Sequence, residues 1–343
     1  NLEQRLELGT MNELDANDQH IVKIVDWLLQ YAFEQRASDI HIEPRRDVGS
    51  VRFRIAGVLH TVYELPAHVC AAVSSRVKIL GRMDVAEKRR PQDGRLKTRT
   101  PQGNEVELRL ATLPTAFGEK LVMRIFDPDV LTRSFEQLGL ADMDLQHWHD
   151  MTDMGHGIVL VTGPTGSGKT TTLYGALSEL NLPAKKIITV EDPVEYRLPR
   201  INQVQVNGKI GLDFKGVLRT TLRQDPDIIM VGEMRDHETV EIGLRGALTG
   251  HLVLSTLHTN DSISSAIRLL DMGAPGYLAA SSLRAIIAQR LVRRICKNCR
   301  TEHRAHEDEL FWIDSIEAGA SRYKYHRGLG CQTCNQTGYR GRI

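Results

Sequence analysis

The chain has 343 residues, 41% of them hydrophobic, which is enough for two or three globular domains. Its 44 Lys and Arg residues nearly balance its 43 Asp and Glu residues, which argues against a surface dedicated to nucleic acid or to an anionic membrane. No apolar run approaches the roughly 18 residues that a membrane-spanning helix needs, and no signal peptide opens the chain. The sequence therefore predicts a globular protein of the cytoplasm.

Residues 1–126 have the pattern of a small α+β domain. Apolar residues at helical spacing predict helices over 18–36 and 67–80, and Cys70 belongs to the apolar face of the second. Alternating apolar and polar residues predict strands over 38–43, 51–58, 106–110 and 120–125. Asp93-Gly94 predicts a hairpin turn within this domain.

Residues 140–295 follow a predicted linker at 127–139 and change to strands that alternate with helices. The strands are continuous apolar runs at 157–162, 187–190, 228–231 and 252–256. Such runs suit a parallel sheet with helices on both faces, so we expect an α/β domain. Functional residues in such a domain lie just beyond the carboxyl ends of the strands.

A glycine-rich phosphate loop follows the first of these strands. Its candidate nucleotide-binding residues are Gly163, Pro164, Thr165, Gly166, Ser167, Gly168, Lys169, Thr170 and Thr171. Glycines let backbone N–H groups face the phosphates, and the next helix presents its positive end to the same anion. Lys169 is predicted to reach the β- and γ-phosphates of ATP, and Thr170 to ligate Mg²⁺. The alternative is an ordinary glycine-rich turn.

Acidic residues follow two other predicted strands. Glu233 follows the strand 228–231 and is a candidate to activate the attacking water and support Mg²⁺, the alternative being a surface residue that starts a helix. Glu191, Asp192 and Glu195 follow the strand 187–190, and one of them is expected to serve the water or the metal. His258 follows the strand 252–256, as a sensor of the γ-phosphate or as an ordinary hydrogen-bonded histidine.

Two Cys-x-x-Cys pairs, Cys296 with Cys299 and Cys331 with Cys334, mark a module over 296–343. Each pair can turn both thiolates toward one ion, and two pairs complete a closed structural zinc site. Disulfides are disfavoured in the cytoplasm. Redox-active or free thiols are the alternative.

Four motifs together resemble, in this order, the boxes of the secretion ATPases that drive type II secretion and type IV pilus assembly. They are the phosphate loop and the segments 188–196, 222–236 and 249–261. The segments 37–44, 90–95 and 113–120 resemble the domain that precedes the motor in that family. The cysteine module resembles its assembly and secretion branch, since the pilus-retraction branch typically lacks it.

The resemblance implies a RecA-like domain, a homohexameric ring, ATP hydrolysis, and peripheral attachment to the bacterial inner membrane through platform proteins. It gives Glu233 the role of catalytic carboxylate, Glu191, Asp192 and Glu195 that of an acidic box, and His251 and His258 that of a histidine box. Relatives have an amino-terminal docking module and continue beyond the last cysteine, so the chain is expected to be part of a longer protein.

We therefore predict an ATP-driven motor for protein export by a type II secretion system, with type IV pilus assembly as the first alternative. Arg109 and Arg124 are candidates to reach the γ-phosphate across a domain or subunit boundary, unless they are ordinary surface arginines. A nucleic-acid-dependent ATPase is less favoured, because the charge is near zero and aromatic residues are few. A nucleotide-binding scaffold without activity is the last alternative.

Overall fold

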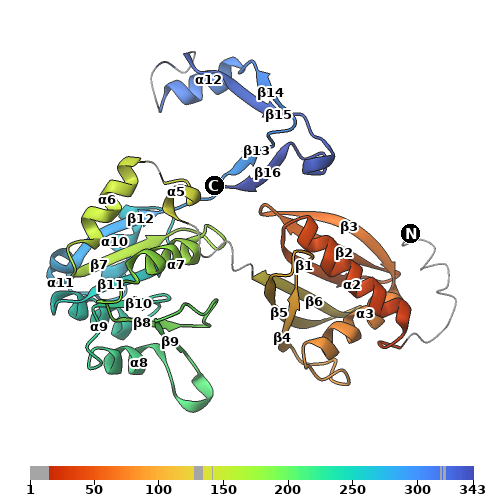
Figure 1. Cartoon of the computed structure of the whole chain (residues 1–343), viewed down its shortest axis with the longest axis horizontal. Helices are drawn as coiled ribbons and strands as arrows, with labels where there is room; N and C mark the ends of the chain where they lie inside the picture. The colour runs from red at the N-terminus through yellow and green to blue at the C-terminus, as the bar shows by residue number, and fades with distance from the viewer. Residues whose placement is uncertain (1–14, 127–133, 141, 317–318, 320–321) are drawn as a thin grey trace. The chain divides into compact units, whose positions relative to one another are not determined.

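The computed structural model describes residues 15–126, 134–140, 142–316, 319 and 322–343. It divides into two compact units, Asn1–Pro128 and Asp129–Ile343 (Figure 1). The division falls inside the predicted linker at 127–139. No helix of the described residues is long and apolar enough to cross a membrane.

In its described residues, the first unit is a six-stranded antiparallel sheet with two helices. The strands are β1 Ala37–Pro44, β2 Val48–Ile55, β3 Val58–Pro66, β4 Gln92–Arg99, β5 Glu105–Thr115 and β6 Gly118–Phe126, in the order β3-β2-β1-β6-β5-β4. The helices are α2, Gln19–Glu34, and α3, Ala67–Leu80, close to the two predicted ranges. Cys70 is buried, as expected from the apolar face of α3.

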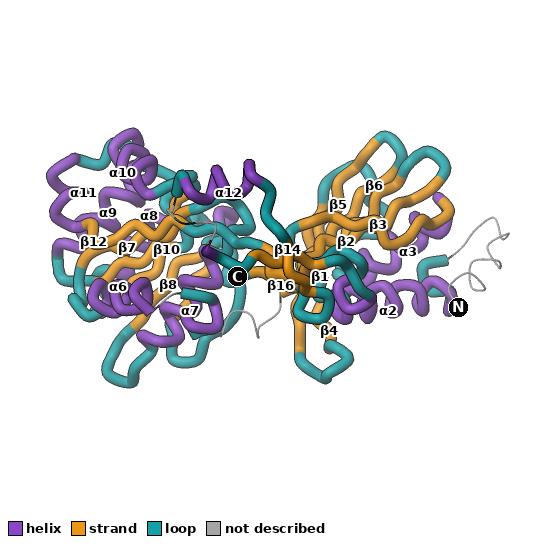
Figure 2. Tube along the Cα trace, turned by 90° about the horizontal axis from the view of Figure 1, so that it is seen from above, coloured by secondary structure: helices purple, strands orange, loops and turns teal. Residues whose placement is uncertain are grey.

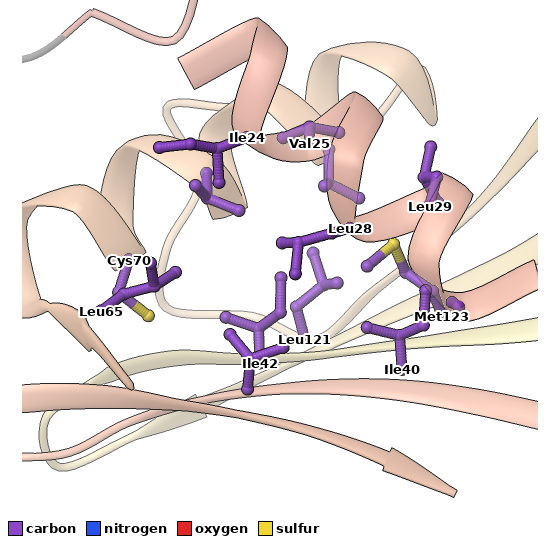
Figure 3. Packing of buried hydrophobic residues seen from close by; sticks show 14 of the residues in the cluster. Ile24, Val25, Leu28, Leu29, Ile40, Ile42, Leu65, Cys70, Leu121 and Met123 are labelled. Carbon is purple, nitrogen blue, oxygen red and sulfur yellow. The ribbon is translucent and has the colours of Figure 1, made fainter. Parts of the chain in front are cut away.

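The core of this unit lies between the helices and one face of the sheet (Figure 3). Ile24 and Leu28 of α2, one helical turn apart, point toward Ile40 and Ile42 of β1, which lie two residues apart on one face of the strand. All four side chains are at most 2% exposed. Each such side chain stabilises the fold by about 1.5–3 kcal/mol relative to an exposed one.

Two local predictions in the first unit were wrong. Asp93 and Gly94 do not form a hairpin turn but lie within β4, paired with Ala111 and Leu110 of β5. A Cβ on Gly94 would come within 2.7 Å of a backbone oxygen, so the glycine permits close packing rather than a turn. The predicted strand 51–58 is interrupted by a turn whose first residue, Ala56, has a φ of 49°.

The second unit is built on a six-stranded parallel sheet, which confirms the predicted α/β class. Its strands are β7 Gly157–Thr162, β8 Ile187–Glu191, β9 Asn202–Gln205, β10 Ile228–Val231, β11 Leu252–Leu257 and β12 Leu283–Ala288, in the order β12-β7-β11-β10-β8-β9. Its helices are α5 Phe135–Leu138, α6 Asp142–Thr152, α7 Lys169–Leu180, α8 Phe214–Thr221, α9 His237–Leu248, α10 Ser262–Asp271 and α11 Gly276–Ser282, with the 3-10 turn η1 at Gly208–Ile210.

Helices cover both faces of this sheet. Figure 2 shows α6 and α7 on one side of it and α9, α10 and α11 on the other. Val159 and Val161 of β7 pack in the core with α7, while the alternate residues Ile158 and Leu160 pack with α9. Because both faces are buried at the centre of the sheet, strands β7 and β10 are almost entirely apolar.

The predicted linker is partly structured. Ser134 caps α5 by accepting a hydrogen bond from the Gln137 N–H, and Phe135 is buried against Trp148 of α6 with ring centroids 4.9 Å apart. The end of the predicted linker therefore folds with the second unit.

The cysteine module extends from the last strand of the parallel sheet. It contains β13 Arg293–Ile295, β14 Arg300–His303, α12 Glu307–Asp314, β15 Tyr325–Gly328, η3 Gln332–Cys334 and β16 Tyr339–Arg342. Two small antiparallel ladders join β13 to β16 and β14 to β15. The two cysteine pairs, which are distant in sequence, lie in the two connections between these ladders, one between β13 and β14 and the other between β15 and β16.

Candidate functional site

The carboxyl ends of β7, β8, β10 and β11 lie along one edge of the parallel sheet. Thr162, the last residue of β7, is in register with Leu257, the last residue of β11. Val231 at the end of β10 is in register with Ser255 of β11 and Val190 of β8. The loops that follow these strands therefore gather at this edge, as the sequence predicts.

The phosphate loop begins directly after β7 and ends at α7. Gly163, Gly166 and Gly168 have φ angles of 149°, 80° and 91°, which side chains with a Cβ rarely adopt. Lys169 and Thr170 form the first turn of α7, so the free N–H groups of the helix point into the loop. This is the geometry that the spacing of the glycines predicts.

Lys169 is buried at the base of the loop, with 8% of its surface exposed. Its Nζ donates to the carbonyl oxygens of Gly163, at 2.8 Å, and Pro164, at 3.2 Å. Among the described residues, no carboxylate forms an ion pair with it. Burial lowers the pKa of Lys169, and the charge of Glu233 offsets part of this effect. A buried ammonium with only neutral partners is suited to binding an anion.

Two hydroxyl groups of the loop also fit a phosphate and metal site. The Ser167 hydroxyl is buried without a hydrogen-bond partner in the part of the chain that the structure describes. Thr170 is exposed on the first turn of α7, where its hydroxyl is accessible to a cation. The two hydroxyls and the positive amino end of α7 can thus act on the same phosphate and its metal ion.

Glu233 and His258 lie beside Lys169. The Glu233 carboxylate forms an ion pair with Arg235, and its other oxygen lies 3.6 Å from Nε2 of His258. Nδ1 of His258 is 3.4 Å from Nζ of Lys169, so the imidazole lies between the acid and the ammonium. Burial and the charge of Lys169 lower the pKa of His258, which keeps the ring neutral near pH 7. The structure thus brings together three predicted site residues.

Glu191, the first residue of the acidic box, is buried in a hydrogen-bond network. It is 3% exposed, and its carboxylate accepts hydrogen bonds from the hydroxyls of Tyr174 and Thr189, each at 2.5 Å, and from the Gln203 amide at 3.2 Å. These donors come from α7, β8 and β9. Glu191 therefore ties three elements together.

The other two acidic residues lie in the segment that this network holds. The Tyr174 hydroxyl accepts the backbone N–H of Glu195 at 3.1 Å. Asp192 is exposed and precedes a cis proline peptide bond. Glu233 and, less strongly, Asp192 raise the pKa of Arg235, which places the charge of Asp192 near the Glu233 pair. Of the three acidic-box residues, Asp192 is thus the one whose charge acts on Arg235, the partner of Glu233.

His251 lies at the opposite edge of the sheet from the phosphate loop. It immediately precedes β11, and its backbone oxygen accepts a hydrogen bond from Gly157, the first residue of β7. Its Nδ1 lies 2.9 Å from the Gly246 oxygen at the end of α9. The two residues of the histidine box are thus at opposite ends of β11, and β7 separates His251 from the phosphate loop of its own chain.

Arg109 and Arg124 face each other in the first unit, on β5 and β6. Arg124 donates from Nε to Oδ1 of Asp39 at 2.9 Å. The Arg109 guanidinium lies over the ring of Phe126, 4.3 Å from its centroid. The structure thus brings the two arginines together, and their role toward the phosphate loop stays a prediction.

Three residues at the strand-end site were not predicted from the sequence. Arg235 pairs with Glu233, Tyr174 holds Glu191, and Gln289 contacts the phosphate loop. Arg235 stands two positions after Glu233, so its proximity could have been noticed. Tyr174 looks like another core position of a helix, and Gln289 follows β12, which was itself not predicted.

The four cysteines converge on one point. Their Sγ atoms all lie within 4.8 Å of one another, with Cys296 to Cys331 at 3.9 Å and Cys299 to Cys334 at 3.8 Å. Disulfides have sulfurs about 2.05 Å apart, whereas a tetrahedral zinc ion with Zn–S bonds of about 2.3 Å places them about 3.8 Å apart. Burial alone would raise the pKa of Cys334, but the N–H groups of Cys331 and Gly338 lower it to about 6. The cluster therefore fits zinc.

Known proteins are similar to this chain in sequence and in fold. The family described as Type II/IV secretion system protein matches residues 15–343. The chain belongs to this family. Among its relatives, the type IV pilus assembly ATPase TfpB of Acinetobacter baylyi is 57% identical over all of this chain and 58% of its own length. The type II secretion system protein E of Pseudomonas aeruginosa is 47% identical over 95% of this chain and 64% of its own length.

Two solved structures have a similar fold. The pilus retraction motor PilT with bound ADP matches with a TM-score of 0.61 and 32% identity, over 80% of each chain. The Legionella pneumophila ATPase DotB matches with a TM-score of 0.65 and 23% identity, over 82% of this chain and 78% of its own. The chain spans about three-fifths of the length of the curated relatives described above. These matches confirm the resemblance to secretion ATPases. The relatives' names include both type IV pilus assembly and type II secretion.

Proposed function

We propose that the chain is the catalytic part of an ATP-hydrolysing motor. The observation that carries this proposal is the convergence of Lys169, His258 and Glu233 beside a loop that is shaped for phosphate. The relatives named as ATPases and the ADP-bound retraction motor support it. Catalysis would consist of positioning and charge neutralisation, without a covalent intermediate.

Each residue at the loop has a proposed role. Lys169 would exchange its carbonyl partners for the β- and γ-phosphates. Glu233 would orient the attacking water and accept its proton once its pair with Arg235 opens. His258, between the two, would respond to the γ-phosphate. Glu191 would act through the acidic segment that it anchors, and Asp192 and Glu195 stay candidates for contacts to water or metal.

The proposed metals have separate roles. Thr170 would hold Mg²⁺, which shields the phosphate charge when bound. Cys296, Cys299, Cys331 and Cys334 would hold one structural zinc ion, since all four positions are filled by the protein. Arg109 and Arg124 would supply further positive charge from the first unit of the same or a neighbouring chain.

The relatives are named for two different machines, type IV pilus assembly and type II secretion. The pilus-assembly relative of Acinetobacter baylyi is 57% identical and the type II relative of Pseudomonas aeruginosa 47%. Other relatives do not separate the two machines, because the pilus assembly ATPase PilB of Myxococcus xanthus is 47% identical and the type II secretion system protein E of Xanthomonas campestris 50%. The proposed machine is therefore a type II secretion system, with type IV pilus assembly as the alternative. We further propose a cytoplasmic homohexamer that meets inner-membrane platform proteins and does not act on nucleic acid.

ATP hydrolysis by the purified chain tests the proposal. We expect magnesium-dependent hydrolysis that Lys169→Ala abolishes. Acidic phospholipid vesicles with a platform protein should stimulate it, and single-stranded DNA should not. Stimulation by DNA alone would instead support the nucleic-acid-dependent class.

A further inference from the structure

Gln289, just beyond the end of β12, packs against the phosphate loop. It directly follows β12, and its backbone N–H donates to the oxygen of Thr162, at 2.9 Å. Thr162 is the last residue of β7 before the loop. Gln289 therefore extends the pairing of β12 with β7 up to the point where the loop begins.

The Gln289 side chain reaches the first turns of α7. Its Oε1 accepts a hydrogen bond from the Thr172 hydroxyl at 2.7 Å. A Cβ on Gly168 would come within 2.8 Å of its Nε2, and a Cβ on Gly163 within 2.4 Å of its backbone oxygen. Gln289 thus packs against both the first and the last glycine of the loop, and a change in its position would change the path of the loop.

The chain leads from Gln289 to the cysteine cluster in seven positions. Arg290 donates to the oxygen of Asn260, in the loop that follows His258. Val292 and Ile343 exchange two backbone hydrogen bonds, at 2.9 and 3.0 Å, and the Cys296 N–H donates to Gly338 at 2.9 Å. This connection is therefore hydrogen-bonded along its length, with no free linker in it.

We infer that Gln289 is a positioning residue for the phosphate loop and that it couples nucleotide affinity to the state of the tetracysteine cluster. The inference rests on the proposed function of that loop. Without the amide, the loop gains space beside Gly168 and the Thr172 hydroxyl loses its acceptor. The loop then spends part of its time in conformations that do not bind. The apparent dissociation constant equals the intrinsic constant divided by the fraction of loops that are competent to bind. Loosening the ladder of β13 and β16, which follows Val292, is expected to weaken nucleotide binding in the same way, because it releases Gln289.

Calorimetric titration of the whole chain with MgATP tests whether Gln289 positions the phosphate loop. Gln289→Ala is expected to weaken binding by about tenfold, in line with a tenth of the loops being competent. Thr172→Val, which removes the hydroxyl at nearly constant volume, should weaken binding similarly, and Thr172→Ser should restore it. Gln30→Ala, at an exposed glutamine of α2, is the matched control. Unchanged affinity in both Gln289→Ala and Thr172→Val overturns the inference, and Thr172→Val decides it alone if Gln289→Ala fails to fold.

Cys334→Ser tests the coupling, with metal content measured alongside. It is expected to weaken MgATP binding severalfold in the wild-type background and to add nothing in the Gln289→Ala background. Fully additive effects would refute the link. Lys169→Ala distinguishes failure of the proposed phosphate site from failure of the Gln289 inference. If Lys169→Ala binds MgATP with full affinity, the proposed phosphate site is wrong. If Lys169→Ala loses affinity while Gln289→Ala keeps it, only the inference about Gln289 is wrong.

Discussion

Arg124 and Asp39 form an ion pair across neighbouring strands, with Nε of the arginine 2.9 Å from Oδ1 of the aspartate. Asp39 is 5% exposed, whereas the Arg124 side chain is 61% exposed. The buried Asp39 carboxylate thus fixes the Arg124 side chain, while part of the guanidinium stays accessible to an anion. A guanidinium held in this way loses little rotamer entropy when it meets a phosphate.

Replacing Arg109 or Arg124 by Ala should therefore cost far more in turnover than in nucleotide affinity. Positive charge is most valuable where negative charge develops, and an arginine finger can be worth on the order of 10³-fold in rate. The measurement is kcat together with the dissociation constant of ATP for each variant. Arg99→Ala, at a 73% exposed arginine of β4, is the control. Wild-type turnover in both single variants would reject the role.

Mixed rings can show which chain supplies the arginine. Arg124→Ala chains mixed with Lys169→Ala chains should regain some activity if the arginine acts on a neighbour, because one interface then pairs an intact loop with an intact arginine. Mass spectrometry must verify that both variants share a ring. No recovery in verified mixed rings would favour action within one chain.

Lys169→Ala and Glu233→Gln should fail at different steps. Lys169→Ala removes the charge that meets the phosphates, so it should lose ATP binding and hydrolysis together. Glu233→Gln keeps the shape of the side chain but removes the base, so we expect retained binding with turnover reduced by about 10²-fold or more. A Glu233→Gln variant that hydrolyses ATP at the wild-type rate would exclude this carboxylate as the base.

Removing a cysteine should release the metal. Metal analysis of the wild-type chain should find close to one zinc ion, and Cys331→Ser or Cys334→Ser should lose it. Because a closed thiolate site couples metal binding to folding, residues 296–334 should then become sensitive to protease. Cys70→Ser is the control, since Cys70 is buried in the first unit. A zinc-free wild-type chain with a protease-resistant module would contradict the assignment.

Tyr174→Phe should destabilise the second unit. The change removes a hydroxyl that donates to Glu191 and accepts the N–H of Glu195, and it leaves a buried carboxylate with one donor fewer. We expect a loss of about 1–3 kcal/mol in the free energy of unfolding. Chemical denaturation monitors it, with Tyr277→Phe, at a 73% exposed tyrosine, as the control. Equal stability of the two variants would show that the hydroxyl network contributes little.

The sequence predicted the middle of the parallel sheet better than its edges. The strands β7, β10 and β11 are buried on both faces, so each is a short and mainly apolar run, which predicts a buried strand. The edge strand β9 is only partly buried and has the polar sequence Asn-Gln-Val-Gln. The edge strand β12 is also only partly buried. Neither edge strand has a pattern that distinguishes it from a loop or a helix.

The same limit applies to the site. The positions of Lys169, Glu233 and His258 follow from strand ends that the apolar runs define. The environment of Glu191 does not, because its donors Tyr174 and Gln203 are brought to it by tertiary packing. Side chains that serve a site from another strand or helix leave no local signal.

The contact between Phe135 and Trp148 decides where an isolated ATPase domain can begin. A truncated chain that starts at Leu140, as the sequence alone suggests, would lack Phe135 and uncover an indole that is now 1% exposed. Losing a buried aromatic side chain costs about 3–5 kcal/mol, a large part of the stability of a typical domain. Such a fragment should be poorly soluble, whereas one that starts before Ser134 keeps the helix cap and the stacked pair.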